Sequence, residues 1–113
     1  MTAIKGVGID IIEIERFRSV LKKKNDHFFK KMFSNAEREY CLSYADPAPH
    51  FAGTFAGKEA ASKALGPEKF PVLSLEIRRS RNGKPEVWRR NKKIAVHLSI
   101  SHTDHIAISM ALR

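Results

Sequence analysis

The chain has 113 residues, a formal net charge of +9 and a hydrophobic fraction of 42%. This length predicts one domain, residues 1–113, and the composition is that of a globular protein rather than a disordered or fibrous one. No stretch reaches the ~18 apolar residues of a membrane span, and the single Cys41 excludes an internal disulfide and favours a reducing, cytoplasmic location.

Periodicity and turn signals in the first half predict, in chain order, a strand over 4–12, a helix over 13–24, a short helix or turn over 27–33, a helix over 34–43, a loop over 46–50 and a helix over 51–66. Ser34 and Glu37 have the spacing of a capping box, which marks a helix start. Gly66-Pro67 supplies a stop signal after the last helix. In the first strand, Val7, Ile9 and Ile11 lie on one face.

The second half predicts strands. Residues 72–79 and 84–88 flank Asn82-Gly83, a strong hairpin signal, and 94–101 and 105–112 alternate on either side of a short turn. The order of elements therefore predicts an α+β fold in which helices cover one face of a largely antiparallel sheet.

The pair Gly57-Lys58 raises the question of a phosphate loop. A Walker loop needs four residues between its glycines and a hydroxyl residue after the lysine. Here Gly53 and Gly57 are separated by three residues, and Glu59 follows Lys58. The segment is instead rich in good helix formers, so we place the pair on a helix.

Two carboxylates are candidate metal ligands. Asp10 fits the N-cap of the following helix, because Asp10-Ile11-Ile12-Glu13 has capping-box spacing, but its carboxylate also suits Mg²⁺. Glu59 is spaced for an i,i+4 ion pair with Lys63, which is worth only a few tenths of a kcal/mol. Either residue alone is weak evidence for a metal site.

Other polar residues also leave two interpretations open. Lys58 and Lys63 fit solvated helix charges, or, with Ser62, the surroundings of a pyrophosphate. The polar residues near the last hairpin fit an outward strand face and a turn, or a hydrogen-bonded phosphate; these are His97, Ser99, Ser101 and His102. A zinc site lacks matched ligands, and a Ser–His nucleophile pair has no support beyond composition.

Basic tracts lie at 22–24, 30–31, 78–81 and 89–93. With a pI near 10.0, they favour a polyanionic partner: nucleic acid, a phosphorylated small molecule or an acidic protein. The rival hypothesis is a basic non-catalytic module that binds RNA or another polyanion, which strong salt-dependent nucleic-acid affinity without Mg²⁺-dependent chemistry would identify. No nucleic-acid-binding signature appears, however.

Three ordered segments resemble the holo-[acyl-carrier-protein] synthases, the small 4′-phosphopantetheinyl transferases of bacterial fatty acid synthesis. They are GVGIDIIEIERF near the start, FAGTFAGKEAASKALG in the middle and HLSISHTDHIAISMAL at the end, with NGKP between the last two. Their order and spacing match over nearly the full chain. The resemblance implies transfer of 4′-phosphopantetheine from coenzyme A to a serine of apo acyl carrier protein, releasing adenosine 3′,5′-bisphosphate.

The resemblance also implies Mg²⁺ as cofactor, a homotrimer, and no nucleic-acid or membrane partner. It makes Asp10, Glu59 and Lys63 catalytic, with Asp10 and Glu59 as metal ligands. Its binding residues are, by position, Lys58, Ser62 and Lys63 at the phosphates of coenzyme A, Asn82, Gly83, Lys84 and Pro85 near the nucleotide, His102 at the 3′-phosphate and Arg16 at the acidic carrier protein.

The chain departs from the family pattern at several positions. Thr54 stands where the family usually has Arg, Gly57 where it has Ala, and the segment after Gly66 is shortened. A family member without activity is therefore a third hypothesis. The sequence does not choose between Glu59 and a metal-bound water as general base. It also does not reveal carrier-protein selectivity, or which subunits would share each site.

Overall fold

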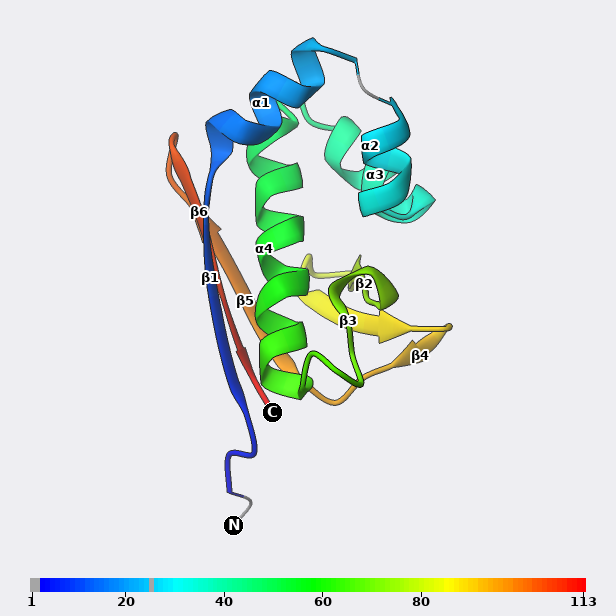
Figure 1. Ribbon diagram of the computed structural model, residues 1–113, viewed down its shortest axis with the longest axis vertical. Coiled ribbons are helices and arrows are strands. Elements are labelled where there is room, and N and C mark those ends of the chain that lie inside the picture. The colour runs from blue at the N-terminus through cyan, green and yellow to red at the C-terminus, as the bar shows by residue number, and fades with distance from the viewer. Residues whose placement is uncertain (1–2, 25) are drawn as a thin grey trace.

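A long helix, α4 (Ala48–Leu65), runs through the centre of the molecule with small sheets beside it (Figure 1). The computed structural model describes residues 3–24 and 26–113. The other elements are β1 (Val7–Glu13), α1 (Ile14–Lys22), α2 (Asp26–Met32), α3 (Asn35–Leu42), the 3₁₀ helix η1 (Val72–Ser74), β2 (Glu76–Arg79), β3 (Pro85–Arg89), β4 (Lys92–Lys93), β5 (His97–His102) and β6 (Ile106–Leu112). Among the described residues, no helix has both the length and the apolar character to cross a lipid bilayer.

The strands form two antiparallel sheets rather than one. The first has the order β1-β6-β5, and its register pairs Val7 with Leu112 and Glu13 with Ile106. The second has the order β2-β3-β4. The α+β class and the antiparallel pairing are confirmed, and α4 contacts both sheets.

The capping box at the start of α3 is confirmed. The Ser34 hydroxyl accepts a hydrogen bond from the Glu37 amide at 3.2 Å, and the Glu37 carboxylate accepts one from the Ser34 amide at 2.9 Å. The stop signal after α4 is also confirmed, because Gly66 follows the last helical residue with φ = +102°, a conformation that favours glycine.

Two boundaries differ from the sequence-based prediction. The predicted loop at 46–50 already contains the first turn of α4, where Pro49 is tolerated because amides there need no helical partner. The predicted strand over 72–79 begins only at Glu76. Before it, the amide and hydroxyl of Ser74 both donate to the Pro71 carbonyl, at 2.9 and 2.6 Å, and close a 3₁₀ turn.

Two apolar clusters form the core, one at each end of α4. Aromatic rings dominate the first cluster, between the N-terminal half of α4 and helices α1 and α2; its buried rings are Phe17, Phe29, Phe33 and Phe51. The second joins the C-terminal half of α4 to both sheets and includes Leu65, Leu75, Ile77, Val87 and Leu98. Together these clusters hold α4 against the strands around it.

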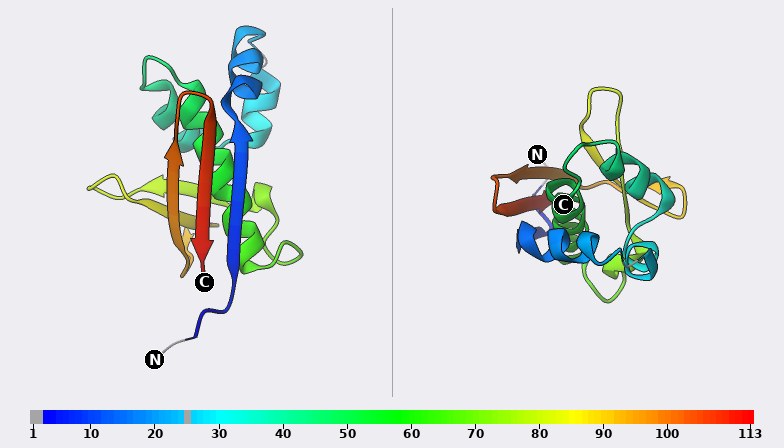
Figure 2. Two further views of the ribbon diagram at one scale, coloured as in Figure 1. Left: turned by 90° about the vertical axis from the view of Figure 1, so that its left-hand side faces the viewer. Right: turned by 90° about the horizontal axis from the view of Figure 1, so that it is seen from above.

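The outer face of the β1-β6-β5 sheet is apolar and exposed along β1 and β6. The left view of Figure 2 shows this face turned toward the viewer, with α4 behind it. Alternate residues point outward and are between 39% and 63% exposed: Val7, Ile9, Ile11, Ile106, Ile108 and Met110. The apolar alternation of β1 thus points away from α4, and the inner face carries Gly8, Asp10 and Ile12.

Candidate active site

Close contact between β1 and α4 places Asp10 beside the middle of the helix. A Cβ atom built on Gly8 would lie 1.9 Å from the Ala60 carbonyl oxygen, and one on Gly6 would lie 2.0 Å from that of Ala64. Only glycine permits such an approach of strand to helix. Because Asp10 follows Gly8 on the same strand face, its side chain also points toward α4.

The structure brings Asp10, Glu59 and Lys63 together, as the resemblance implies. Lys63 Nζ lies 3.5 Å from Asp10 Oδ1 and donates a hydrogen bond of 2.9 Å to the Ile9 carbonyl. Burial raises the pKa of Glu59, and the negative charge of Asp10 raises it further, while Lys63 opposes this shift. Two carboxylates therefore lie close enough to repel each other.

The N-cap interpretation of Asp10 is wrong. Strand β1 continues through Glu13, and α1 begins at Ile14 with Glu13 as its N-cap residue, without a side-chain capping bond. The carboxylate of Asp10 is thus separated from the helix start by the rest of the strand. It remains available to the site beside α4.

The donor set fits a hard divalent cation that keeps most of its coordination for water and substrate. In the described part of the chain, no group of three or more His, Cys, Asp and Glu is arranged to hold a metal ion. Mg²⁺, however, usually takes one or two protein carboxylates and fills its octahedron with waters and phosphate oxygens. The mutual repulsion of Asp10 and Glu59 is also what a bound cation would relieve.

The side chains of Lys58 and Ser62 point away from the site formed by Asp10, Glu59 and Lys63. The Lys58 side chain is 3% exposed, and its ammonium contacts the Glu37 carboxylate and the Met32 carbonyl, both at 2.9 Å. The Ser62 hydroxyl is buried and donates to the Phe70 carbonyl at 2.6 Å. The structure therefore does not bring these two residues to the space beside Asp10.

The buried Glu37 is a residue of interest that the sequence did not single out. As the second half of the capping box it already had a complete local role, so nothing in the sequence pointed to Lys58 as a distant partner. In the fold it also accepts a hydrogen bond of 2.7 Å from the Ile77 amide. It joins α3, β2 and α4 at one point.

The segment 82–85 forms the tip of the β2–β3 hairpin. The Asn82 side-chain oxygen accepts from the Lys84 amide at 3.2 Å and from the Ser80 hydroxyl, and Gly83 has φ = +83°. These bonds give the tip a defined shape. No contact described for this structure connects residues 82–85 to Asp10 or Glu59.

His102 stands at the end of β5, within an exposed group of rings. Its ring centroid lies 5.7 Å from that of His50, which in turn stacks on Tyr44 at 3.5 Å. Burial and the nearby charges of His102 and Arg79 lower the pKa of His50. Among the described residues of one chain, none of these rings forms a hydrogen bond with Asp10 or Glu59.

Thr54 and Arg16 occupy contrasting environments. Thr54 is 2% exposed, and its hydroxyl lies 3.6 Å from the buried Cys41 sulfur, so it faces the core. Arg16 is exposed on α1 and lines a small cavity of about 150 Å³ together with Phe17, Val20 and Phe28. Arg16 is thus available to a partner, with an apolar depression beside it.

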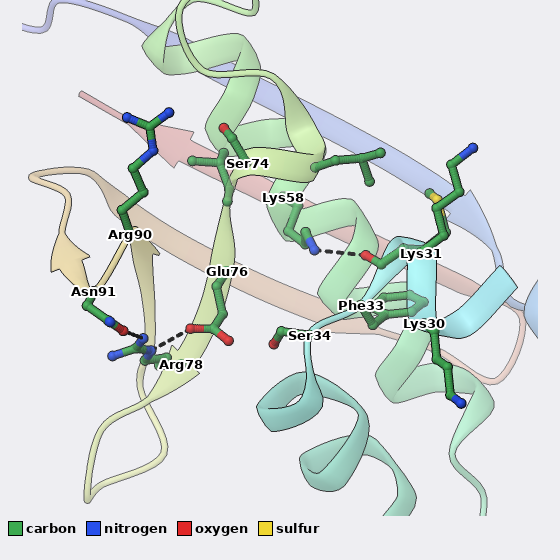
Figure 3. A pocket seen from close by; sticks show the side chains of 13 residues that line it. Lys30, Lys31, Phe33, Ser34, Lys58, Ser74, Glu76, Arg78, Arg90 and Asn91 are labelled. Carbon is green, nitrogen blue, oxygen red and sulfur yellow. Dashed lines mark hydrogen bonds and ion pairs between the residues drawn. The ribbon is translucent and has the colours of Figure 1, made fainter. Parts of the chain in front are cut away.

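A second cavity, of about 410 Å³, lies on another side of α4, between α2 and the β2-β3-β4 sheet (Figure 3). Three of the basic tracts contribute to its lining, through Lys30, Lys31, Arg78 and Arg90. In Figure 3, Lys58 forms part of the wall, while Arg78 is engaged by Glu76 at 2.6 Å and by Asn91 at 2.8 Å. Asp10 and Glu59 do not line this cavity.

Comparisons with known proteins agree on one family. A family model described as the 4′-phosphopantetheinyl transferase superfamily matches residues 6–111. Similar relatives include the holo-[acyl-carrier-protein] synthase of Chlorobaculum parvum, 43% identical over 111 residues, covering 94% of this chain and 95% of that protein. The same enzyme of Thermodesulfovibrio yellowstonii is 37% identical over 110 residues, covering 96% and 97%.

Solved structures of such enzymes share the fold. A holo-(acyl-carrier-protein) synthase from Bacillus anthracis, in complex with CoA (3′,5′-ADP), matches with a TM-score of 0.80 and 34% identity, covering 98% of this chain and 96% of that one. The Helicobacter pylori enzyme in complex with coenzyme A matches with a TM-score of 0.79 and 30% identity, covering 93% and 96%.

Proposed function

The chain belongs to the 4′-phosphopantetheinyl transferase superfamily, as an enzyme of its holo-[acyl-carrier-protein] synthase group, and from this premise we propose its reaction in detail. It transfers 4′-phosphopantetheine from coenzyme A to a serine of apo acyl carrier protein and releases adenosine 3′,5′-bisphosphate. The observation that carries this proposal is the convergence of Asp10, Glu59 and Lys63 beside the β1–α4 contact. The relatives solved with coenzyme A support the choice of donor.

In this proposal Asp10 and Glu59 hold Mg²⁺. When bound, the ion would neutralise negative charge on the pyrophosphate and stabilise the charge that develops on the leaving group. Lys63, half-exposed beside Asp10, adds a positive charge at the same place. The nucleophile is a serine of the partner, so the chain itself needs no nucleophilic triad.

Proton removal from that serine is assigned to Glu59. Glu59 lies at the same site as Asp10, and an ionised carboxylate there can accept the hydroxyl proton as a general base. Lys58 and Ser62 receive no direct contact with phosphate in this proposal. Each would first have to break a buried interaction.

One assay tests the proposed reaction. Protein, coenzyme A, Mg²⁺ and apo carrier protein are incubated, and mass spectrometry follows the carrier protein. Addition of one phosphopantetheine, lost when the metal is chelated, is the expected result. An unchanged carrier mass, together with salt-dependent RNA binding, would favour the basic RNA-binding module instead.

We further propose that three copies assemble through the outer face of the β1-β6-β5 sheet. Six apolar side chains line this face, and such contiguous exposure marks an interaction surface. A neighbouring copy would also explain why 82–85 and His102 do not reach the carboxylates within one chain. In the assembly, residues 82–85 and His102 would reach the Asp10 and Glu59 carboxylates of a neighbouring copy.

Ile9→Lys is expected to break this assembly, because a charge placed in the centre of the apolar face would be buried without a partner. Light scattering after size exclusion should give three times 12.8 kDa for the unaltered chain and 12.8 kDa for the variant. Leu73→Lys, at a 52% exposed position on η1, is the control and should retain the larger mass. An unaltered chain with the mass of a single copy would contradict the trimer.

Arg16→Glu tests the docking of the carrier protein. Reversal of this exposed charge should raise the KM for carrier protein by at least about tenfold and leave the KM for coenzyme A within about twofold, because attraction between opposite charges becomes repulsion. Lys92→Glu, also at an exposed position but on β4, controls for the change in total charge. Equal losses for both substrates would contradict a docking role.

A further inference from the structure

The ion pair between Glu37 and Lys58 is the most deeply buried charged feature among the described residues. Each residue is 2% exposed. The Glu37 carboxylate accepts from the Lys58 ammonium, from its own cap partner Ser34 and from the Ile77 amide. The Lys58 ammonium also donates to the last carbonyl of α2, at Met32. The elements α2, α3, β2 and α4 therefore meet at one pair of charges.

Such a pair is a poor source of stability. Removing two charges from water costs about as much as their attraction and hydrogen bonds return, and apolar residues of similar volume often serve equally well. Where buried charges have a demonstrated purpose, it is to select one arrangement of packed elements.

The surface of α4 indicates which arrangement the Glu37–Lys58 pair selects. Phe51 and Leu65 are buried near the two ends of α4, and between them Lys58 is the only long side chain at a buried position. The other buried residues of that stretch are small: Ala52, Gly53, Thr54, Ala56, Gly57, Ala60, Ala61, Ser62 and Ala64. Helices normally lock into place because large side chains fit between those of their neighbours. Phe51 and Leu65 thus hold the ends of α4, while in its middle the long buried side chain that can fix the rotation of the helix is that of Lys58.

We propose that Glu37 is a positioning residue, which holds Lys58 and thereby fixes the rotation of α4 that aims Glu59 at Asp10. Consecutive residues on a helix point about 100° apart, so anchoring Lys58 toward α3 sets the direction of Glu59. A rotation of about 20° moves a group about 5 Å from the axis by about 2 Å. Mg²⁺ demands near-ideal geometry and would not tolerate that displacement.

The test uses the double variant Glu37→Gln/Lys58→Met, which removes both charges and retains a side-chain carbonyl as acceptor. The single variant Lys58→Met leaves the Glu37 charge buried without its partner and should lower the Tm by more than about 10 °C. The double variant should recover most of this loss. Its dissociation constant for Mn²⁺, measured by electron paramagnetic resonance with coenzyme A present, should nevertheless be at least tenfold higher than that of the unaltered chain.

Leu75→Ala is the matched control, because it removes core volume from the second apolar cluster but no charge. All titrations are made at a temperature where circular dichroism shows every variant folded. Unaltered Mn²⁺ affinity in the double variant would overturn the proposal, and so would an equal weakening in Leu75→Ala.

The inference rests on the proposed function only for the identity of the bound ion. A crystal structure of the double variant tests it independently, because we expect α4 to rotate and the Glu59 carboxylate to move by about 2 Å relative to Asp10, as the helix geometry requires. An unmoved Glu59 would overturn the positioning role even if the unaltered enzyme is active. If the unaltered chain shows no metal-dependent transfer, the proposed reaction fails, and the crystal structure still decides the role of Glu37.

Discussion

Asp10→Asn is expected to lower the rate of phosphopantetheine transfer by roughly 1000-fold with little change in stability. The amide retains the shape of the carboxylate but loses the charge that would hold the divalent ion opposite Glu59. A metal that stabilises transition-state charge is worth several kcal/mol, and each step of about 1.4 kcal/mol corresponds to a factor of ten in rate.

Stability should be preserved for two reasons. The contact of Lys63 with Asp10 is partly exposed, and such pairs contribute about 0–1 kcal/mol. Removal of the Asp10 charge also removes one cause of the raised Glu59 pKa. Because a raised carboxylate pKa means that the charged form is disfavoured in the folded state, stability near neutral pH should stay constant or rise slightly.

Rates are measured by mass spectrometry of the carrier protein over a range of Mg²⁺ concentrations, and stability by thermal unfolding. Glu39→Gln, an exposed carboxylate on α3, is the control and should leave the rate within about twofold. Transfer by Asp10→Asn within tenfold of the unaltered rate at saturating Mg²⁺ would remove Asp10 from the metal site.

Sequence periodicity predicted most helices and strands, because the signals that start, continue and end them come from residues close together in the sequence. The capping box at Ser34–Glu37 and the stop at Gly66 are local signals, and both are confirmed. The same kind of signal misled at Asp10, where capping-box spacing occurs inside a strand. Pairing with β6 extends β1 through Glu13, and this long-range pairing overrides the local pattern.

The sequence did not reveal which face of β1 is buried. Apolar residues at 7, 9 and 11 normally predict the inner face of a strand. Here the inner face instead carries Gly8 and Asp10, because α4 approaches too closely for larger side chains. The outer apolar face is consistent with the proposed assembly. Because assembly involves several chains, the periodicity of one chain does not distinguish a face buried in the core from a face buried between copies.

Candidate site residues on α4 were predictable as a group but not individually. Lys58, Ser62 and Lys63 all lie within the segment that carries the family resemblance. The helix is buried on most sides, so its sequence has no clear polar face that would separate solvent-facing residues from buried ones. Only the fold shows that Lys63 reaches Asp10 while Lys58 turns toward Glu37.

Gly8→Ala is expected to reduce transfer by about 100-fold in a protein that still folds. The added Cβ would lie 1.9 Å from the Ala60 carbonyl oxygen, whereas ordinary contacts begin at 3.4 Å. Both atoms are held by backbone, so β1 must move away from α4 by up to about 1.5 Å, the difference between these two distances. Displacement of a catalytic group by about 1 Å can cost 100-fold in rate.

The cost in stability should be smaller than the cost in activity. Overpacking of this kind typically destabilises by about 1–3 kcal/mol, which lowers the Tm by several degrees but leaves the chain folded at about 25 °C. Transfer rate and thermal unfolding are therefore measured on the same preparation. A Gly8→Ala protein with a rate within threefold of the unaltered chain would show that the β1–α4 spacing does not set the site.

Gly57→Ala supplies the matched control, because it adds the same methyl group where the same helix faces β5 instead of β1. There the nearest atom is the tip of the Ile100 side chain at 3.0 Å, which can shift by a few tenths of an ångström. Alanine in place of a helical glycine also favours the helix by up to about 1 kcal/mol, so the variant should be as stable as the unaltered chain or more so. Since Gly57 does not separate β1 from α4, its replacement should leave the rate nearly unchanged. A large loss in both variants would mean that α4 tolerates no added volume on any side, and the effect of Gly8→Ala could then not be assigned to the distance between Asp10 and Glu59.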